Sequence, residues 1–267
     1  MSNYIISGCS YTDMPDSWAR QFLNNLDDDY MNHILCGQIG AGNNLISQAV
    51  LVNLLDYKKS FKCNVKNISD IKVIVMWSHP HRLDYLYESE SIDNNTFWSR
   101  LFKFKKGVRL NRENGGKDYM MTGNNGVLDM GSLKPNNMLY SHPHINYWTS
   151  FFKYIHNDKY AWNETLKNII YLQTILKQKN VKYLFLTYTN FMKDFFGKFK
   201  FCEYQENLLD LNNFLFTDKS FGGLREWVIN NTNKWDDGYG NHPHKDSHKE
   251  FIDNFFKPHL KELKWPT

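Results

Sequence analysis

A serine near the start of the chain and histidines near its end are residue types that carry out nucleophilic catalysis. Ser10 follows an apolar stretch, Ile5-Ile6, and a turn of small residues, Ser7-Gly8-Cys9, which together predict a strand that ends at a hydroxyl group. In open α/β sheets, catalytic groups gather at the carboxyl ends of the strands. A serine hydroxyl is a poor nucleophile near neutral pH and needs a base that a further group orients. We therefore expect Ser10 to be a nucleophile, provided that the rest of the chain supplies these partners.

Two further stretches contain the groups that such a serine requires. Gly40-Ala41-Gly42-Asn43 is a glycine-rich turn that opens into a helix, and its backbone N–H groups and the amide of Asn43 are suited to hold an oxyanion. Glycine-rich turns that only begin a helix are as common as turns that bind an oxyanion. This stretch alone therefore does not establish an oxyanion-binding role. The stretch 235–248 is rich in Asp, Gly and His and precedes the last predicted helix. It can bring an imidazole back to the sheet edge where Ser10 is expected.

The elements that must position these groups alternate between strand and helix in the first third of the chain, which predicts a doubly wound α/β domain. The run Ile71–Trp77 is apolar almost throughout, as is typical of a parallel strand covered on both faces. Further strands are expected at 30–36 and 181–187. Helices are expected at about 16–25, 45–55, 148–177 with a break near 157–158, and 247–263.

This alternation stops between residues 86 and 147. The stretch is rich in Gly and Asn, and 119–130 is typical of a small hairpin. A segment of this length within a compact domain is usually a lid, a binding excursion or an interaction surface. We expect one domain, 1–267, with an insertion at about 86–147 that is a candidate surface for a protein partner.

Composition excludes several classes of function. A net charge of +4 over 267 residues, without a dense Lys/Arg cluster, argues against nucleic acid as the main partner. The four cysteines are scattered, which is neither a zinc pattern nor a disulfide framework, and this indicates free thiols in a reducing compartment. No apolar run approaches the ~20 residues that span a bilayer, and the apolar stretch before Cys9 is too short for a signal peptide. We expect a cytoplasmic protein, with incorporation into a larger particle left open.

Three short motifs resemble those of the SGNH (GDSL-like) hydrolase superfamily. Gly8-Cys9-Ser10-Tyr11-Thr12 resembles its first block, with Cys9 in the place of an Asp, and Gly40 resembles the glycine of the second block. His242-Pro243, followed by Ser247-His248, resembles the fifth block. The resemblance covers the first 80 residues and about the last 35. It implies a three-layer α/β/α, flavodoxin-like fold with a central parallel sheet. It also implies a serine esterase with no metal or other cofactor.

In this family Ser10 would be the nucleophile and His242 the base, while the backbone N–H groups of Ser10 and Gly40 would bind the oxyanion. Two positions depart from the family pattern. His79 stands where a third-block Asn supplies a further oxyanion donor. That role stays open between the His79 imidazole, the Ser78 hydroxyl, and the amides of Asn43 and Asn44. Tyr239 stands three residues before His242, where the acid is expected, so Asp237, with Asp236 behind it, becomes the candidate acid.

The resemblance and the aromatic residues of the 86–147 insertion favour an ester, above all an acetyl ester, carried on a carbohydrate or another small molecule. Two other interpretations remain. The departures at Tyr239 and His79 are also compatible with a fold that has lost catalysis and serves as a binding or structural module. The His-Pro-His sequence, present at 79–81, 142–144 and 242–244, is compatible with a metallohydrolase, with Asp84 or Asp237 as a further ligand.

Overall fold

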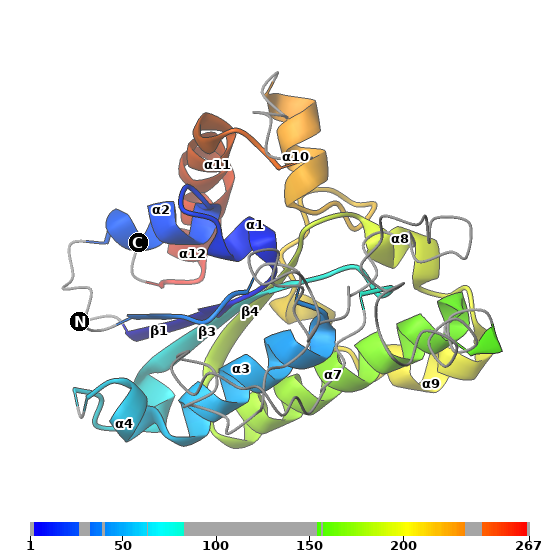
Figure 1. Ribbon diagram of the computed structural model, residues 1–267, viewed down its shortest axis with the longest axis horizontal. Coiled ribbons are helices and arrows are strands. Elements are labelled where there is room, and N and C mark those ends of the chain that lie inside the picture. Colours follow the sequence, from blue (N-terminus) through cyan, green and yellow to red (C-terminus); the bar gives the residue numbers. More distant parts are fainter. Residues whose placement is uncertain are drawn as a thin grey trace, which may run out of the picture.

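A four-stranded parallel sheet forms the centre of the molecule (Figure 1). The computed structural model describes residues 3–26, 33–38, 41–62, 64–82, 154–155, 157–232 and 242–265. The strands lie in the order β2-β1-β3-β4. Their bounds are β1 (Asn3–Ser7), β2 (His33–Leu35), β3 (Ile71–Trp77) and β4 (Lys182–Thr187). The prediction of an α/β fold with a parallel sheet is confirmed.

The strands are buried on both faces because successive side chains of a strand point to opposite sides of the sheet. In β3, Val73 and Val75 enter one core cluster while Ile74 and Met76 enter the other. This two-sided burial explains why the strand reads as an unbroken apolar run, as the sequence predicts.

Two layers of helices cover the sheet (Figure 1). One core cluster packs under α3 (Asn43–Leu55) and α7 (Asp158–Gln178). The opposite cluster packs under α2 (Trp18–Asn24), α10 (Leu224–Asn231) and the helical segment that ends the chain. Shorter helices complete the described part: α1 (Ser10–Asp13), α4 (Tyr57–Ser60), α8 (Phe191–Phe195) and α9 (Glu203–Glu206).

Helix ends follow local capping chemistry. The break expected near 157–158 is the start of α7, where Asn157 accepts a hydrogen bond from the backbone N–H of Tyr160 (3.0 Å). The last predicted helix is present as α11 (Lys245–Phe251), a π-helical stretch (Ile252–Phe256) and α12 (Lys257–Glu262). It begins two residues earlier than predicted, because His244 caps it by accepting from the N–H of Asp246 (3.2 Å).

Some predictions fall outside the described residues. These are the 86–147 insertion with its hairpin, and the part of the predicted 148–177 helix that precedes residue 154. Within the described part, Cys9, Cys36 and Cys202 are buried and form no disulfide, as the scattered spacing predicts. None of the helices described there is long and apolar enough to cross a membrane.

Candidate active site

The sheet reverses its winding direction at β1. From β1 the chain runs to β2 on one side and then crosses to β3 on the other. In doubly wound sheets such a switch opens a crevice outside the carboxyl ends of the two central strands, where ligands bind. Ser10 follows β1 at this edge, and Ser78 and His79 follow β3. The topology therefore places the predicted nucleophile at the switch point.

The turn between β1 and α1 requires a glycine. A Cβ built on Gly8 would lie 2.2 Å from Thr12 Oγ1 and 3.1 Å from the carbonyl oxygen of Met76. Its absence lets the turn pack closely against β3 and against the first turn of α1. The carbonyl of Gly8 also accepts a hydrogen bond from the N–H of Gln38 (2.9 Å), so the loop after β2 lies beside the turn that carries Ser10.

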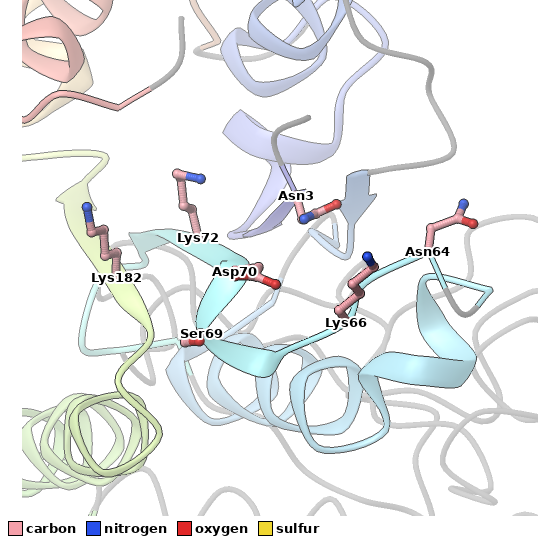
Figure 2. Close-up of a pocket in the computed structure, with 7 residues that line it drawn as sticks. All are labelled: Asn3, Asn64, Lys66, Ser69, Asp70, Lys72 and Lys182. Atoms are coloured by element: carbon pink, nitrogen blue, oxygen red, sulfur yellow. The ribbon is translucent and has the colours of Figure 1, made fainter.

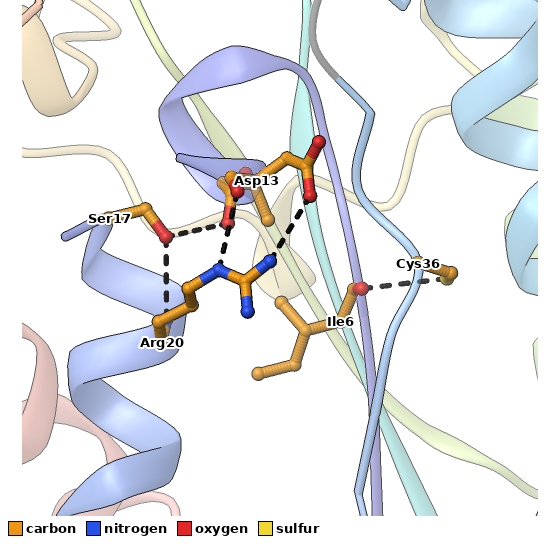
Figure 3. Close-up of polar contacts among 6 residues, drawn as sticks. Ile6, Asp13, Ser17, Arg20 and Cys36 are labelled. Carbon is orange, nitrogen blue, oxygen red and sulfur yellow. Dashed lines mark hydrogen bonds and ion pairs between the residues drawn. The ribbon is translucent and has the colours of Figure 1, made fainter. Parts of the chain in front are cut away.

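A set of hydrogen bonds fixes α1 to α2 (Figure 3). Ser17 Oγ donates to the carbonyl of Thr12 (2.7 Å) and accepts from the N–H of Arg20 (3.4 Å), which caps α2. The Arg20 guanidinium in turn donates to the Asp13 carbonyl (3.3 Å) and pairs with the Asp13 carboxylate (3.5 Å). Strand β1 is fixed on its other side, because the N–H of Cys36 donates to the Ile6 carbonyl (2.9 Å). The turn that carries Ser10 is thus held from both directions.

Ser10 and His242 meet at this edge. A hydrogen bond of 2.7 Å joins Ser10 Oγ and His242 Nε2, two residues that are 232 positions apart. Ser10 is buried, with 4% of its surface exposed. The two ends of the chain are also joined nearby, because Gln21 Nε2 donates to the carbonyl of Lys245 (2.9 Å). The final segment therefore returns an imidazole to the serine, as the sequence predicts for this loop.

An aromatic row supports the imidazole. The His242 ring packs against Tyr11, with 4.7 Å between ring centroids, and Tyr11 packs against Tyr188 at 4.8 Å. The guanidinium of Arg82 lies over the Tyr188 ring, 5.4 Å from its centroid. Tyr11 follows Ser10 directly in the sequence, so one turn carries both the hydrogen-bond partner of His242 and the ring that packs against it.

Electrostatics keep this row in defined protonation states. Burial raises the pKa of Tyr11, and it raises that of Tyr188 to about 12, so both phenols stay neutral near pH 7. Burial alone would lower the pKa of the Arg82 guanidinium, but the nearby Cys9, Tyr188 and Tyr11 raise it overall. Arg82 therefore brings a buried positive charge to the edge of the sheet that carries Ser10.

No family model matches the sequence, and no curated protein or solved structure matches it.

Asn43 has structural contacts at the same edge. Its Oδ1 accepts from the N–H of Ser78 (2.8 Å), and its Nδ2 donates both to the Ser78 carbonyl (3.0 Å) and to Thr165 Oγ1 (3.0 Å). The side chain thereby joins α3, the end of β3 and α7. Both amide hydrogens are engaged, so a role toward an oxyanion would require Asn43 to give up one of these bonds.

His79 lies on the α7 and α8 side of the edge. Its ring stacks on His81 (5.4 Å) and meets Phe191 and Phe195 edge-on, and its Nδ1 accepts from the N–H of His81 (3.3 Å). Burial, and then the nearby His81 and Arg82, lower its pKa to about 4. The ring is therefore neutral near pH 7 and carries its proton on Nε2. It remains chemically suited to donate a hydrogen bond, and the described residues show no contact between it and Ser10.

Two predicted site residues, Gly40 and Asp237, lie outside the described residues, as does Asp236. The metal interpretation finds no cluster in the described part of the chain, where no three His, Cys, Asp or Glu side chains come together to hold an ion. His81 there pairs with Asp158 (2.9 Å), which also pairs with Lys198 (3.0 Å).

The sequence motifs assign no function to Tyr11, Tyr188 or Arg82. The positions of all three residues in the sequence indicate that they lie near Ser10. Tyr11 comes just after β1, Tyr188 follows β4 directly, and Arg82 lies five residues beyond β3. Side chains at these positions face the same sheet edge in a parallel sheet.

His248, which stands in the position of the family's Gly-His motif, is buried in α11 with 3% of its surface exposed. Burial, and to a lesser extent His242, lower its pKa to about 3. The ring is neutral in the folded protein, whereas in the unfolded chain it titrates near 6.5. The unfolded state therefore binds more protons in acid.

Lowering the pH from 7 to 5 is therefore expected to reduce the free energy of unfolding by about 2 kcal/mol through His248 alone. This contribution is complete above pH 6.5 and is lost as the pH falls toward 3. Urea unfolding at both pH values, compared between the wild type and His248→Leu, measures it. The control is His244→Gln, which removes the less buried histidine that caps the same helix and is expected to keep the pH dependence of the wild type. Equal pH dependence in wild type and His248→Leu would contradict the expectation.

Proposed function

We propose that the chain is a serine esterase that hydrolyses a carboxylic ester. The observation that carries this proposal is the 2.7 Å hydrogen bond between Ser10 Oγ and His242 Nε2 at the switch point of a doubly wound sheet. A nucleophile within hydrogen-bond reach of an imidazole is the minimum unit of covalent acyl transfer.

The mechanism follows from this geometry. His242 Nε2 accepts the Ser10 proton as the oxygen attacks the acyl carbon, and returns it to the leaving alcohol. Water then attacks the acyl-enzyme with the same imidazole as base. Ser10 is the first residue of α1, and the first N–H groups of a helix have no acceptor within it. The Ser10 N–H is therefore suited to bind the oxyanion, together with the N–H of Gly40 that the family resemblance implies.

We further propose that this esterase is of the SGNH type. The strand order β2-β1-β3-β4 agrees with the start of the flavodoxin-like order, 2-1-3-4-5, in which the β1/β3 edge carries the ligand. The motifs around Ser10 and His242 add to this. Asp237 is the proposed acid behind His242, and Tyr11 supports the ring from its face.

An acetyl ester of a carbohydrate is the substrate that we propose. A hollow of about 520 Å³ opens at the carboxyl edge of β3, between α3 and α7, and its volume suits a sugar-sized leaving group. Arg82 lines this hollow and also contacts Tyr188 of the aromatic row, so the hollow and the Ser10 edge share one side chain. Asn44 and Tyr171 give it amide and aromatic surface, which suits the hydroxyls and faces of a sugar.

The decisive experiment is labelling with a fluorophosphonate, which reacts with activated serines. The wild type is expected to take up one equivalent of the probe, with the label mapped to Ser10 by mass spectrometry, and Ser10→Ala is expected to take up none. Folding of the variant is checked by circular dichroism. Absence of labelling in a folded wild-type protein, together with inactivity on a panel of acyl esters, would favour the non-catalytic binding module instead.

A further inference from the structure

A second hollow lies at the opposite end of the sheet from Ser10. Figure 2 shows the residues that line it. It is an open hollow of about 410 Å³ beside the amino-terminal ends of β1, β3 and β4. We call it the lysine hollow, after the three lysines in its lining. Its lining includes Asn3, Lys66, Ser69, Asp70, Lys72 and Lys182.

The lysine hollow brings like charges together, which costs stability through electrostatic repulsion. Lys72 of β3 and Lys182 of β4 are register partners on neighbouring strands, and Lys66 adds a third ammonium group to the same lining. Neighbouring strands are about 4.8 Å apart, and like charges at paired positions are destabilising. In the described part of the chain none of the three forms an ion pair with a carboxylate.

Both burial and a neighbouring charge act on Lys72. Its stem is half-buried, and its ammonium lies 5.7 Å from the ring centroid of Tyr4. Burial, and next the charge of Lys182, lower the pKa of Lys72, while Asp70 opposes the change. Asp70 is itself engaged, because its carboxylate accepts from the N–H of Asn67 (3.2 Å) and caps the short helix at Ile68–Asp70. One capping carboxylate does not balance three ammonium groups.

The donors around the hollow match one class of ligand. Three ammonium groups, the Ser69 hydroxyl and the Asn3 amide offer hydrogen-bond donors to a group with several anionic oxygens. Lysine is a common phosphate ligand, acting as a point charge. The volume corresponds to a small metabolite rather than to a single ion.

We propose that the lysine hollow binds a phosphorylated small molecule through Lys66, Lys72 and Lys182. The bound oxyanion would neutralise the paired lysines, which otherwise repel each other. This site lies at the far edge of the sheet from Ser10 and does not depend on the proposed esterase activity.

Isothermal titration calorimetry of the full chain with pyrophosphate, at constant ionic strength, tests the proposal. We expect saturable binding to one site, weakened about tenfold or more in Lys182→Gln and in Lys72→Gln, because each variant removes one charge-assisted contact. Lys261→Gln, which removes an exposed lysine of α12, is the charge-matched control and is expected to bind as the wild type does. Thermal unfolding confirms that each variant is folded.

Parallel titrations with inorganic phosphate and with a sugar phosphate distinguish the free ion from a phosphate ester as the ligand. Tighter binding of the ester supports the proposal as stated. Lack of saturable binding to all three probes would overturn it, as would equal weakening by Lys261→Gln. Binding of a single-stranded oligonucleotide without binding of pyrophosphate would also overturn it, in favour of a nucleic-acid surface.

Discussion

Replacement of Ser10 with alanine is expected to lower kcat/KM for hydrolysis of p-nitrophenyl acetate by about a thousandfold or more, without unfolding the protein. His242→Ala is expected to cause a similar loss, because the hydroxyl then lacks the base 2.7 Å away. Since the two groups act as one unit, the double variant should be no slower than either single variant. Steady-state kinetics of the three variants measure this non-additivity.

Ser7→Ala is the matched control for Ser10→Ala. Ser7 is also buried and lies three residues earlier, but its hydroxyl donates to the Ile46 carbonyl (3.1 Å) and takes no part in the proposed chemistry. Its replacement should cost about 1 kcal/mol of stability and leave kcat unchanged. Full activity of Ser10→Ala, or an equal loss in Ser7→Ala, would remove Ser10 from the role of nucleophile.

Replacement of Gly223 with alanine is expected to have the largest effect on stability, about 3 kcal/mol or more. Gly223 precedes α10, and a Cβ there would lie 2.6 Å from the Thr187 carbonyl oxygen and 2.6 Å from the N of Thr189. These are backbone atoms at the end of β4, so a rotamer change cannot relieve the clash. Chemical denaturation measures the loss, and activity should fall as well because Tyr188 lies in the displaced segment.

Gly197→Ala separates this steric effect from backbone strain. Gly197 has a φ of +74°, which disfavours a side chain, yet no atom lies within 4 Å of the position that its Cβ would take. A cost of about 1 kcal/mol is expected there. If Gly223→Ala proves no more destabilising than Gly197→Ala, the close approach of α10 to β4 is not what stabilises this end of the sheet.

Much of the fold could be predicted from the sequence, because a parallel sheet covered on both faces produces long apolar runs. Ile71–Trp77 is such a run, and β3 has the predicted bounds. The sequence predicts β2 only approximately, at 30–36 instead of His33–Leu35, since three residues with partial burial give little periodic signal. The π-helical stretch at Ile252–Phe256 has no sequence signature of its own.

The candidate site could be predicted where a residue type and its position in the chain agree. Ser10 ends a strand-turn unit and His242 precedes the last helix, so both could be expected at one edge. The contacts of Asn43 with Ser78 and Thr165 depend on tertiary packing, which spacing does not reveal. The same holds for the contacts of Tyr188 with Tyr11 and Arg82. These three residues follow three different strands, so only the packing of the sheet brings them together.

The contact between Ser10 and His242 has a consequence for the order of folding. It closes a loop of more than two hundred residues, and contacts of such sequence separation form late because the chain must first lose much conformational entropy. The turn that carries Ser10 leaves the ribosome before the segment that carries His242. During synthesis Ser10 therefore lacks its hydrogen-bond partner until His242, 232 residues later, has been made.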